Sequence, residues 1–135
     1  MKIFLDANVL FAAAYSPSGK SAALLETVAS MIITSDYAVE EARRNIQIKK
    51  PEAMARLEKF LSSIKIVNSR TSHVCPIDVP EKDRPIFVTA LAERTTHLLT
   101  GDLKDFGAFM NDPVETEGIL IQTVHDFLKS LANEK

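Results

Sequence analysis

The sequence has a single cysteine, no long hydrophobic run and no large excess of either charge. Cys75 alone cannot form an internal disulfide, which fits a reducing compartment. No apolar run approaches the roughly 20 residues that a membrane-spanning helix needs. Met1 and Lys2 lead directly into a predicted strand, without the layout of a signal peptide. We therefore expect a cytoplasmic protein with no membrane partner.

The formal net charge of −2 provides no general attraction for nucleic acid. Any polyanionic substrate must therefore be held by a local basic patch or by a metal ion. The 135 residues, 46% of them hydrophobic and 25% charged, are enough for one ordinary core. Internal repeats, low-complexity stretches and interdomain linkers are absent from the sequence, so residues 1–135 are expected to form one domain.

Short apolar runs alternate along the chain with segments of helical periodicity. Strands are predicted near 3–5, 32–34, 64–67, 97–100 and 119–121. Helices are predicted over 10–15, 20–31, 36–49, from Pro51 onward, and over 83–94 and 123–132. Loops are predicted over 68–81 and 101–112, the second with one helical turn. This alternation predicts an α/β fold, namely a three-layer α/β/α domain around a parallel sheet of about five strands.

Acidic residues follow the predicted strands at one edge of this sheet. Asp6 ends the first strand, and Asp102 lies two residues beyond the fourth. The carboxyl ends of parallel strands share one edge, where ligands bind in open α/β sheets. Asp83 opens the helix before the fourth strand, while Glu40 and Glu41 lie early in the helix after the second. So many carboxylates repel one another unless a cation neutralises them, and oxygen ligands without histidine or cysteine favour Mg²⁺ or Mn²⁺ over zinc.

Each acidic residue also has a purely structural interpretation. Asp6 and Asp83 stand where N-caps occur, an acid near the start of a helix favours its dipole, and Asp102 after Gly101 fits a turn. Taken singly, Asp83 and either glutamate are better explained in this way. The functional hypothesis rests on all four positions falling on one predicted edge.

Three segments carry a family resemblance: FLDANVL at the start, VEEARRNI after Ser35, and DRPIFVTALAERTTHLLTGDLKDF. In order and spacing they resemble the acidic motifs of PIN-domain ribonucleases, in the compact prokaryotic branch that includes VapC-type toxins. The similarity extends from residue 1 to about 126. It departs from the family pattern at Ala7, where a hydroxyl residue is common. Thr100, Asp102 and Phe106 fit the most specific motif, T-x-D-x-x-x-F.

The resemblance implies a set of site residues. Glu41 is chosen over Glu40 because Ala42 and Ile46 then occupy the apolar positions of the family pattern. The implied catalytic and metal-binding residues are Asp6, Glu41, Asp83 and Asp102, supported by Asn8, Thr100 and Asp105. Basic residues on the predicted helices have the pattern of a solvated face, namely Lys49, Lys50, Arg56 and Lys59. Together with Arg43 and Arg44 they can instead form a stripe that faces phosphates, and these two arginines are the predicted substrate contacts.

The function implied by the resemblance is Mg²⁺- or Mn²⁺-dependent endonucleolytic hydrolysis of single-stranded or loop RNA. Frequent homodimers and, for a toxin, an antitoxin partner are implied as well. Two alternatives belong to other classes. One is a PIN-fold module without catalysis that binds RNA or a protein. The other is a haloacid-dehalogenase-type phosphatase, which is less favoured because Asn8 stands where that chemistry needs a second aspartate.

Overall fold

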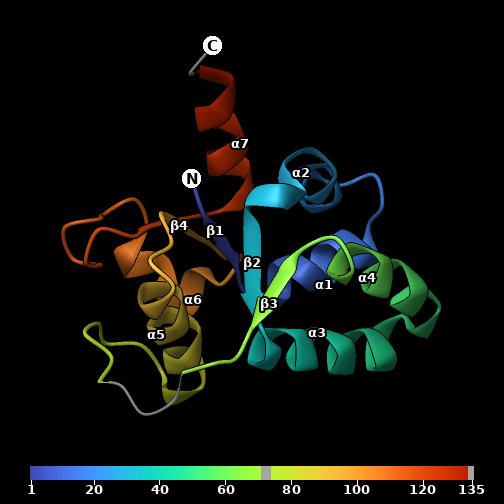
Figure 1. Ribbon diagram of the computed structural model, residues 1–135, viewed down its shortest axis with the longest axis horizontal. Coiled ribbons are helices and arrows are strands. Elements are labelled where there is room, and N and C mark those ends of the chain that lie inside the picture. The colour runs from blue at the N-terminus through green and yellow to red at the C-terminus, as the bar shows by residue number, and fades with distance from the viewer. Residues whose placement is uncertain (71–73, 134–135) are drawn as a thin grey trace.

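Five parallel strands form one sheet in the order β3-β2-β1-β4-β5, in a computed structural model that describes residues 1–70 and 74–133 (Figure 1). The predicted parallel sheet of about five strands is confirmed. Its strands are β1 (Ile3–Leu5), β2 (Ile32–Ser35), β3 (Lys65–Val67), β4 (His97–Leu99) and β5 (Leu120–Gln122).

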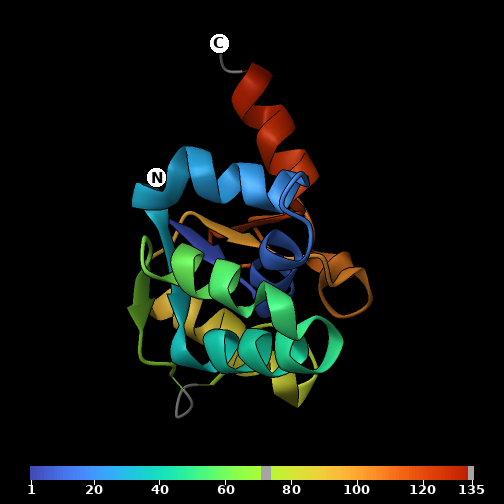
Figure 2. The ribbon, with the colours of Figure 1, turned by 90° about the vertical axis from the view of Figure 1, so that its right-hand side faces the viewer.

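Seven α-helices in the described ranges connect and cover these strands. They are α1 (Ala7–Tyr15), α2 (Lys20–Val28), α3 (Asp36–Lys49), α4 (Met54–Leu61), α5 (Arg84–Ala92), α6 (Leu103–Phe106) and α7 (Val124–Asn133). Figure 1 shows α1 to α4 grouped beside β2 and β3, and α5 and α6 on the side of β4. Figure 2, turned by a quarter, shows α7 rising from the body next to α2, against which it packs.

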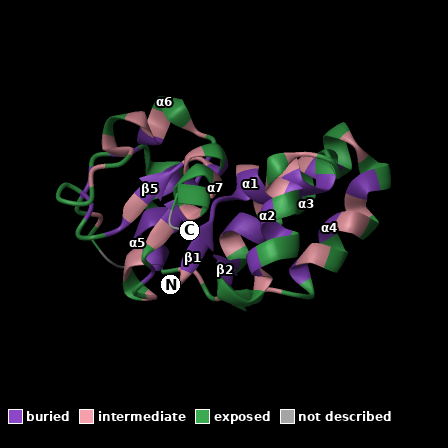
Figure 3. Ribbon diagram, turned by 90° about the horizontal axis from the view of Figure 1, so that it is seen from above, coloured by how far each residue is buried: buried purple, intermediate pink, exposed green. Residues whose placement is uncertain are grey.

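Burial follows the position of each strand in the sheet. Ile3, Phe4 and Leu5 of the central strand β1 are fully buried, because helices cover both faces of the sheet around it. Figure 3 shows the buried residues concentrated on the strands and on the inward sides of the helices. The edge strand β3 is exposed at Lys65 and Ile66. None of the helices among residues 1–70 and 74–133 is long and apolar enough to cross a membrane.

Element boundaries differ from the sequence prediction in a few places. Helix α1 begins at Ala7 instead of residue 10, because the Asp6 carboxylate accepts a hydrogen bond from the Ala7 amide and caps the helix. The helix predicted over 20–31 ends at Val28 and continues as a 3₁₀ turn. The predicted loop 68–81 includes residues 71–73, which lie outside the described part of the chain.

The order of the strands places a switch point between β1 and β4. From β1 the chain proceeds outward to β2 and β3, and then returns to the other side of β1 to form β4 and β5. Connections therefore leave β1 and β4 in opposite directions, which opens a crevice at their carboxyl ends. Asp6 directly follows β1, and Thr100 directly follows β4.

Candidate active site

Asp6 and Thr100 meet at this switch point. The Thr100 hydroxyl donates to Oδ2 of Asp6 at 2.8 Å, and it accepts from the Asp102 amide at 3.1 Å. Asn8 Nδ2 donates to the same hydroxyl at 3.1 Å, so the one proton and both lone pairs of Thr100 are used. Thr100 is fully buried and Asp6 nearly so. The threonine therefore ties the ends of β1 and β4 together around the Asp6 carboxylate.

Asn8 completes this arrangement from the first turn of α1. Its Nδ2 also contacts Oδ2 of Asp6 at 3.2 Å, and its Oδ1 accepts from the Gly101 amide at 2.7 Å. Both ends of the Asn8 side chain are thus engaged in positioning neighbouring groups. The supporting role predicted for Asn8 and Thr100 has a geometric basis in these contacts.

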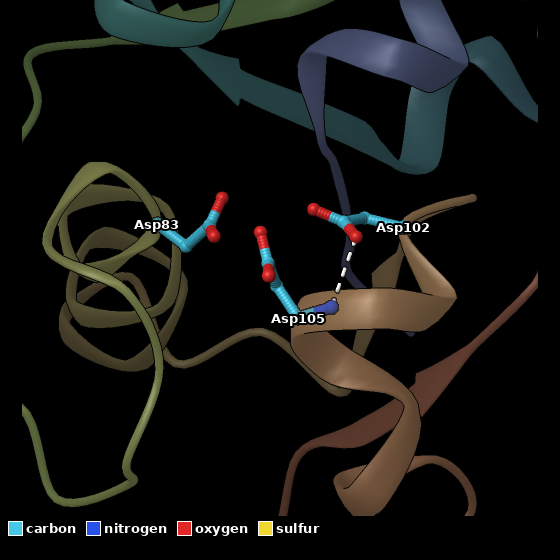
Figure 4. A group of neighbouring side chains, drawn as sticks. All are labelled: Asp83, Asp102 and Asp105. Atoms are coloured by element: carbon cyan, nitrogen blue, oxygen red, sulfur yellow. Dashed lines mark hydrogen bonds between the residues drawn. The ribbon is translucent and has the colours of Figure 1, made fainter.

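Three further carboxylates converge beside this pair (Figure 4). Asp83, Asp102 and Asp105 each place one oxygen so that the three atoms lie within 4.8 Å of one another. Asp83 precedes α5, while Asp102 caps α6 by accepting from the Asp105 amide at 3.0 Å. Asp83 makes no capping hydrogen bond to its own helix. Its carboxylate instead faces Asp105, which favours the functional interpretation of Asp83 over the structural one (Figure 4).

Lys82 neutralises part of this charge. Its Nζ lies 2.7 Å from Oδ2 of Asp105, 3.2 Å from Oδ2 of Asp83 and 3.7 Å from Oδ2 of Asp102. The Tyr37 hydroxyl donates to the Lys82 carbonyl at 2.7 Å, which fixes the backbone at this point. A cation therefore already contacts all three members of the acidic trio, as expected for a group of carboxylates that attracts positive charge.

The surroundings of the site shift the pKa values of its carboxylates. Burial raises the pKa of Asp6 to about 6, and the charges of Glu41 and Asp102 act in the same direction. Burial and a hydrogen bond with Asp105 also raise the pKa of Asp83. The Lys82 ammonium lowers the pKa of Asp105. Perturbed carboxylates gathered in a crevice are typical of functional sites.

A groove of about 510 Å³ leads away from these acids. Glu41 is one of the residues that line it, and Glu40 is not. Glu41 lines the groove together with Asn8, Lys82 and Asp102. The side chain of Glu40 is 76% exposed and pairs with Arg44 at 3.3 Å. The structure thus brings Asp6, Glu41, Asp83 and Asp102 to one region, with Glu41 rather than Glu40 facing it.

Two predicted positions differ from the expectation. Asp105, ranked behind the four principal acids, belongs to the acidic trio because its carboxylate, in the first turn of α6, points toward Asp83 (Figure 4). Arg43 does not line the groove; its guanidinium binds both oxygens of Glu58 on α4, at 2.8 and 2.7 Å.

Lys82 is a site residue that the sequence analysis did not predict, although it directly precedes Asp83 in the sequence.

The trio suits a small divalent cation. Its donors are all carboxylate oxygens, and it is the one such acidic group in the described ranges of the chain. Oxygens bound to a common Mg²⁺ at about 2.1 Å lie at most about 4.2 Å apart. The three oxygens lie within 4.8 Å of one another and would move closer together to share an ion, and Asp6 and Glu41 supply further oxygens nearby.

Similarity to known proteins appears at the level of structure. No protein-family model matches the chain, and no curated protein sequence matches it. Among solved structures, VapBC2 from Rickettsia felis, bound to a promoter DNA fragment, is 20% identical with a TM-score of 0.65, covering 91% of this chain and 98% of that chain. DNA-bound VapBC from Salmonella typhimurium is 16% identical with a TM-score of 0.67, covering 92% and 98%.

A third similar structure is VapC20 from Mycobacterium tuberculosis, described as a sarcin–ricin-loop-cleaving toxin. It is 11% identical with a TM-score of 0.60, covering 80% of this chain and 95% of that chain. The match spans nearly the full length of all three solved chains. The chain therefore has the fold of VapC-type PIN-domain toxins, as the sequence motifs predicted.

Proposed function

We propose that the protein is a Mg²⁺- or Mn²⁺-dependent endoribonuclease that hydrolyses phosphodiester bonds in single-stranded or loop RNA. The observation that carries this proposal is the convergence of Asp83, Asp102 and Asp105 beside Asp6 at the β1/β4 switch point. Asp6, Asp83 and Asp102 would hold the ion, with Asp105 and Glu41 available as further ligands. A bound ion of this kind would activate water and stabilise the charge that develops on the phosphate during in-line displacement.

The protein's own residues prepare this site. Thr100 and Asn8 hold the Asp6 carboxylate in one orientation, so little reorganisation is needed when it acts as a ligand. Asp102 is fixed by its hydrogen bond to the first turn of α6. Glu41 stands on the groove wall, where it can accept a hydrogen bond from an attacking water. No side chain is required as a covalent nucleophile.

We further propose that the protein is the toxin of a toxin–antitoxin pair and forms homodimers. The support is the fold shared with VapBC proteins and with VapC20, over nearly their whole length. Expression in bacterial cells tests the toxin proposal. Wild type is expected to arrest growth, and Asp102→Asn is expected to relieve the arrest at equal protein level. Equal growth with both proteins would contradict it, and light scattering of the purified chain tests the dimer.

Cleavage of a mixed set of labelled single-stranded RNAs in Mn²⁺ tests the nuclease proposal directly. Wild type is expected to cut, while Asp6→Asn and Asp102→Asn lose activity with folding intact. Glu26→Gln is the matched control, because it removes one exposed negative charge on α2 away from the site. Equal cleavage by all four proteins would indicate a contaminating nuclease.

A non-catalytic RNA- or protein-binding module is the second candidate. The observation that favours it is the contact of Lys82 with all three members of the trio, since an internal cation can stabilise such a cluster without a metal ion. Mn²⁺ titration separates the two functions. A working site gives thermal stabilisation that Asp102→Asn removes, whereas a silent module gives little stabilisation in either protein.

A further inference from the structure

The groove that starts at the catalytic acids has the exposed face of α1 as its floor. Asn8, Phe11 and Ala12 line it, and Tyr15 continues the same face one turn further. The wall on one side is α3, with Glu41, Asn45 and Lys49 at intervals of four residues. Helices α1 and α3 both begin at the carboxyl ends of the strands before them, so their groove-lining side chains form two rows that extend away from the acidic trio.

Aromatic rings and ammonium groups pair along this track. Lys49 Nζ lies 5.4 Å from the Phe11 ring centroid, and Lys50 Nζ lies 4.6 Å from the Tyr15 centroid. The two rings are 5.3 Å apart between centroids and tilted by 32°. Phe11 is half-buried and Tyr15 is 45% exposed, so part of each ring reaches solvent beside the ammonium group that lies over it. We call Phe11, Tyr15, Lys49 and Lys50 the aromatic–lysine strip.

The positive charge of the strip is not neutralised locally. Within residues 1–70 and 74–133, neither Lys49 nor Lys50 has a carboxylate within 4.0 Å. By contrast, Arg43 and Arg44 on the same helix are paired with Glu58 and Glu40. The lysines therefore concentrate positive charge at one end of the groove, in a chain whose overall charge is −2.

We propose that the aromatic–lysine strip binds the single-stranded segment of an RNA substrate next to the scissile phosphate. This inference rests on the nuclease function proposed above. Bases that are not paired can stack on aromatic rings whatever their identity, while ammonium groups contact the phosphates between them. One base stacks on the Phe11 ring, and Lys49 contacts the phosphate of that nucleotide. Tyr15 and Lys50 make the same two contacts with a second nucleotide, farther from the acids. A duplex hides its bases from the rings and is bound less well.

Binding of labelled RNA in EDTA tests the strip without cleavage. The probes are single-stranded oligo(A) and oligo(U) of roughly 12 nucleotides, a length within known single-strand sites, and the duplex formed by annealing them. Wild type is expected to prefer the single strands. Phe11→Leu keeps an apolar side chain against the core and removes the ring, so it is expected to weaken binding at least about fivefold.

Salt dependence separates the two kinds of contact. Lys49→Gln is expected to weaken binding and to reduce the slope of log K against log salt by about 0.7, which corresponds to one phosphate contact on a single strand. Phe11→Leu should leave that slope unchanged. The matched control is Lys65→Gln, which removes the same charge from an exposed residue at the amino end of β3, opposite the catalytic edge.

The outcomes distinguish this proposal from the nuclease proposal. If Phe11→Leu and Lys49→Gln both bind single strands as tightly as Lys65→Gln does, the strip does not hold RNA and the proposal is overturned. If both variants weaken binding but wild type cleaves nothing in Mn²⁺, the strip is supported and catalysis is not. Equal affinity of wild type for single strands and duplex would also overturn the proposal.

Discussion

The Lys82 ammonium lies 2.7 Å from Oδ2 of Asp105, a residue 23 positions later in the chain. The same ammonium contacts Asp83 and Asp102, so one side chain reaches two of the three residues proposed to hold the catalytic ion. Two cations at adjoining positions repel each other, and this repulsion is only partly screened at a half-buried site. Lys82 would therefore compete with the proposed divalent ion for the trio.

Lys82→Met is expected to increase the affinity for Mn²⁺ by about tenfold, because it removes the competing charge and keeps the length of the side chain. Calorimetric titration in mildly alkaline buffer measures the change. Lys104→Met is the control, since Lys104 is an exposed lysine on α6 that makes no ion pair in the described ranges. Weaker Mn²⁺ binding by Lys82→Met would show instead that the lysine organises the ligands.

Thr100→Val removes the hydroxyl that positions Asp6, Asn8 and the Asp102 amide. Because these buried groups then lack a partner, we expect a loss of about 1–3 kcal/mol in the free energy of unfolding. Mn²⁺ affinity should fall about 10- to 100-fold, as for other groups that orient metal ligands.

Thr95→Val provides the matched control for this substitution. Thr95 is also buried, and its hydroxyl donates to the Ala90 carbonyl away from the acids. Denaturant unfolding and Mn²⁺ titration of both variants separate stability from site geometry. A similar drop in Mn²⁺ affinity for Thr95→Val would mean that general destabilisation, not the loss of orientation, accounts for the effect.

Stability in EDTA should depend on the protonation of Asp6. Its pKa rises from 3.8 to about 6 on folding because of burial, so the folded state binds the proton more tightly. The contribution of Asp6 protonation to the free energy of unfolding is therefore fully present below about pH 4. It is lost as the pH rises through about 6. A difference of about 2 between the two pKa values corresponds to roughly 3 kcal/mol.

Asp6→Asn lacks this titration, so its unfolding free energy relative to wild type should increase across the same pH range. Urea unfolding of the two proteins at several pH values measures the difference, and other titrating groups largely cancel in it. A constant difference between the two proteins would mean that the Asp6 pKa is not raised.

Arg43→Gln and Arg44→Gln are expected to reduce RNA affinity less than Lys49→Gln does. Both arginines already pair with glutamates, and neither lines the groove. The anisotropy of labelled single-stranded RNA compares the three variants under one salt condition. A larger loss for either arginine would support the original prediction of substrate contact and would shift the binding track to the outer side of α3.

The order of elements could be derived from the sequence because it depends on local patterns. Apolar runs such as Ile3–Leu5 and the helical spacing of residues 36–49 indicate which side chains must be buried, whatever surrounds them. The carboxyl-end rule then placed Asp6 and Asp102 at one edge of the sheet. Boundaries were less accurate, since the start of α1 depends on whether the Asp6 side chain caps it.

Only the tertiary structure decided which groups the long charged side chains contact. The sequence contains Lys82, Arg43 and Lys49 as similar basic residues on exposed positions. Folding brings Lys82 to Asp102 and Asp105 at the start of α6, Arg43 to Glu58, and Lys49 over Phe11. A flexible cation is directed by the charges and rings that other elements bring near it, and hydrophobic periodicity carries no information about those neighbours. The sequence by itself determined the sheet and its acidic edge, and the packing of α1, α3 and α6 determined which groups face each other there.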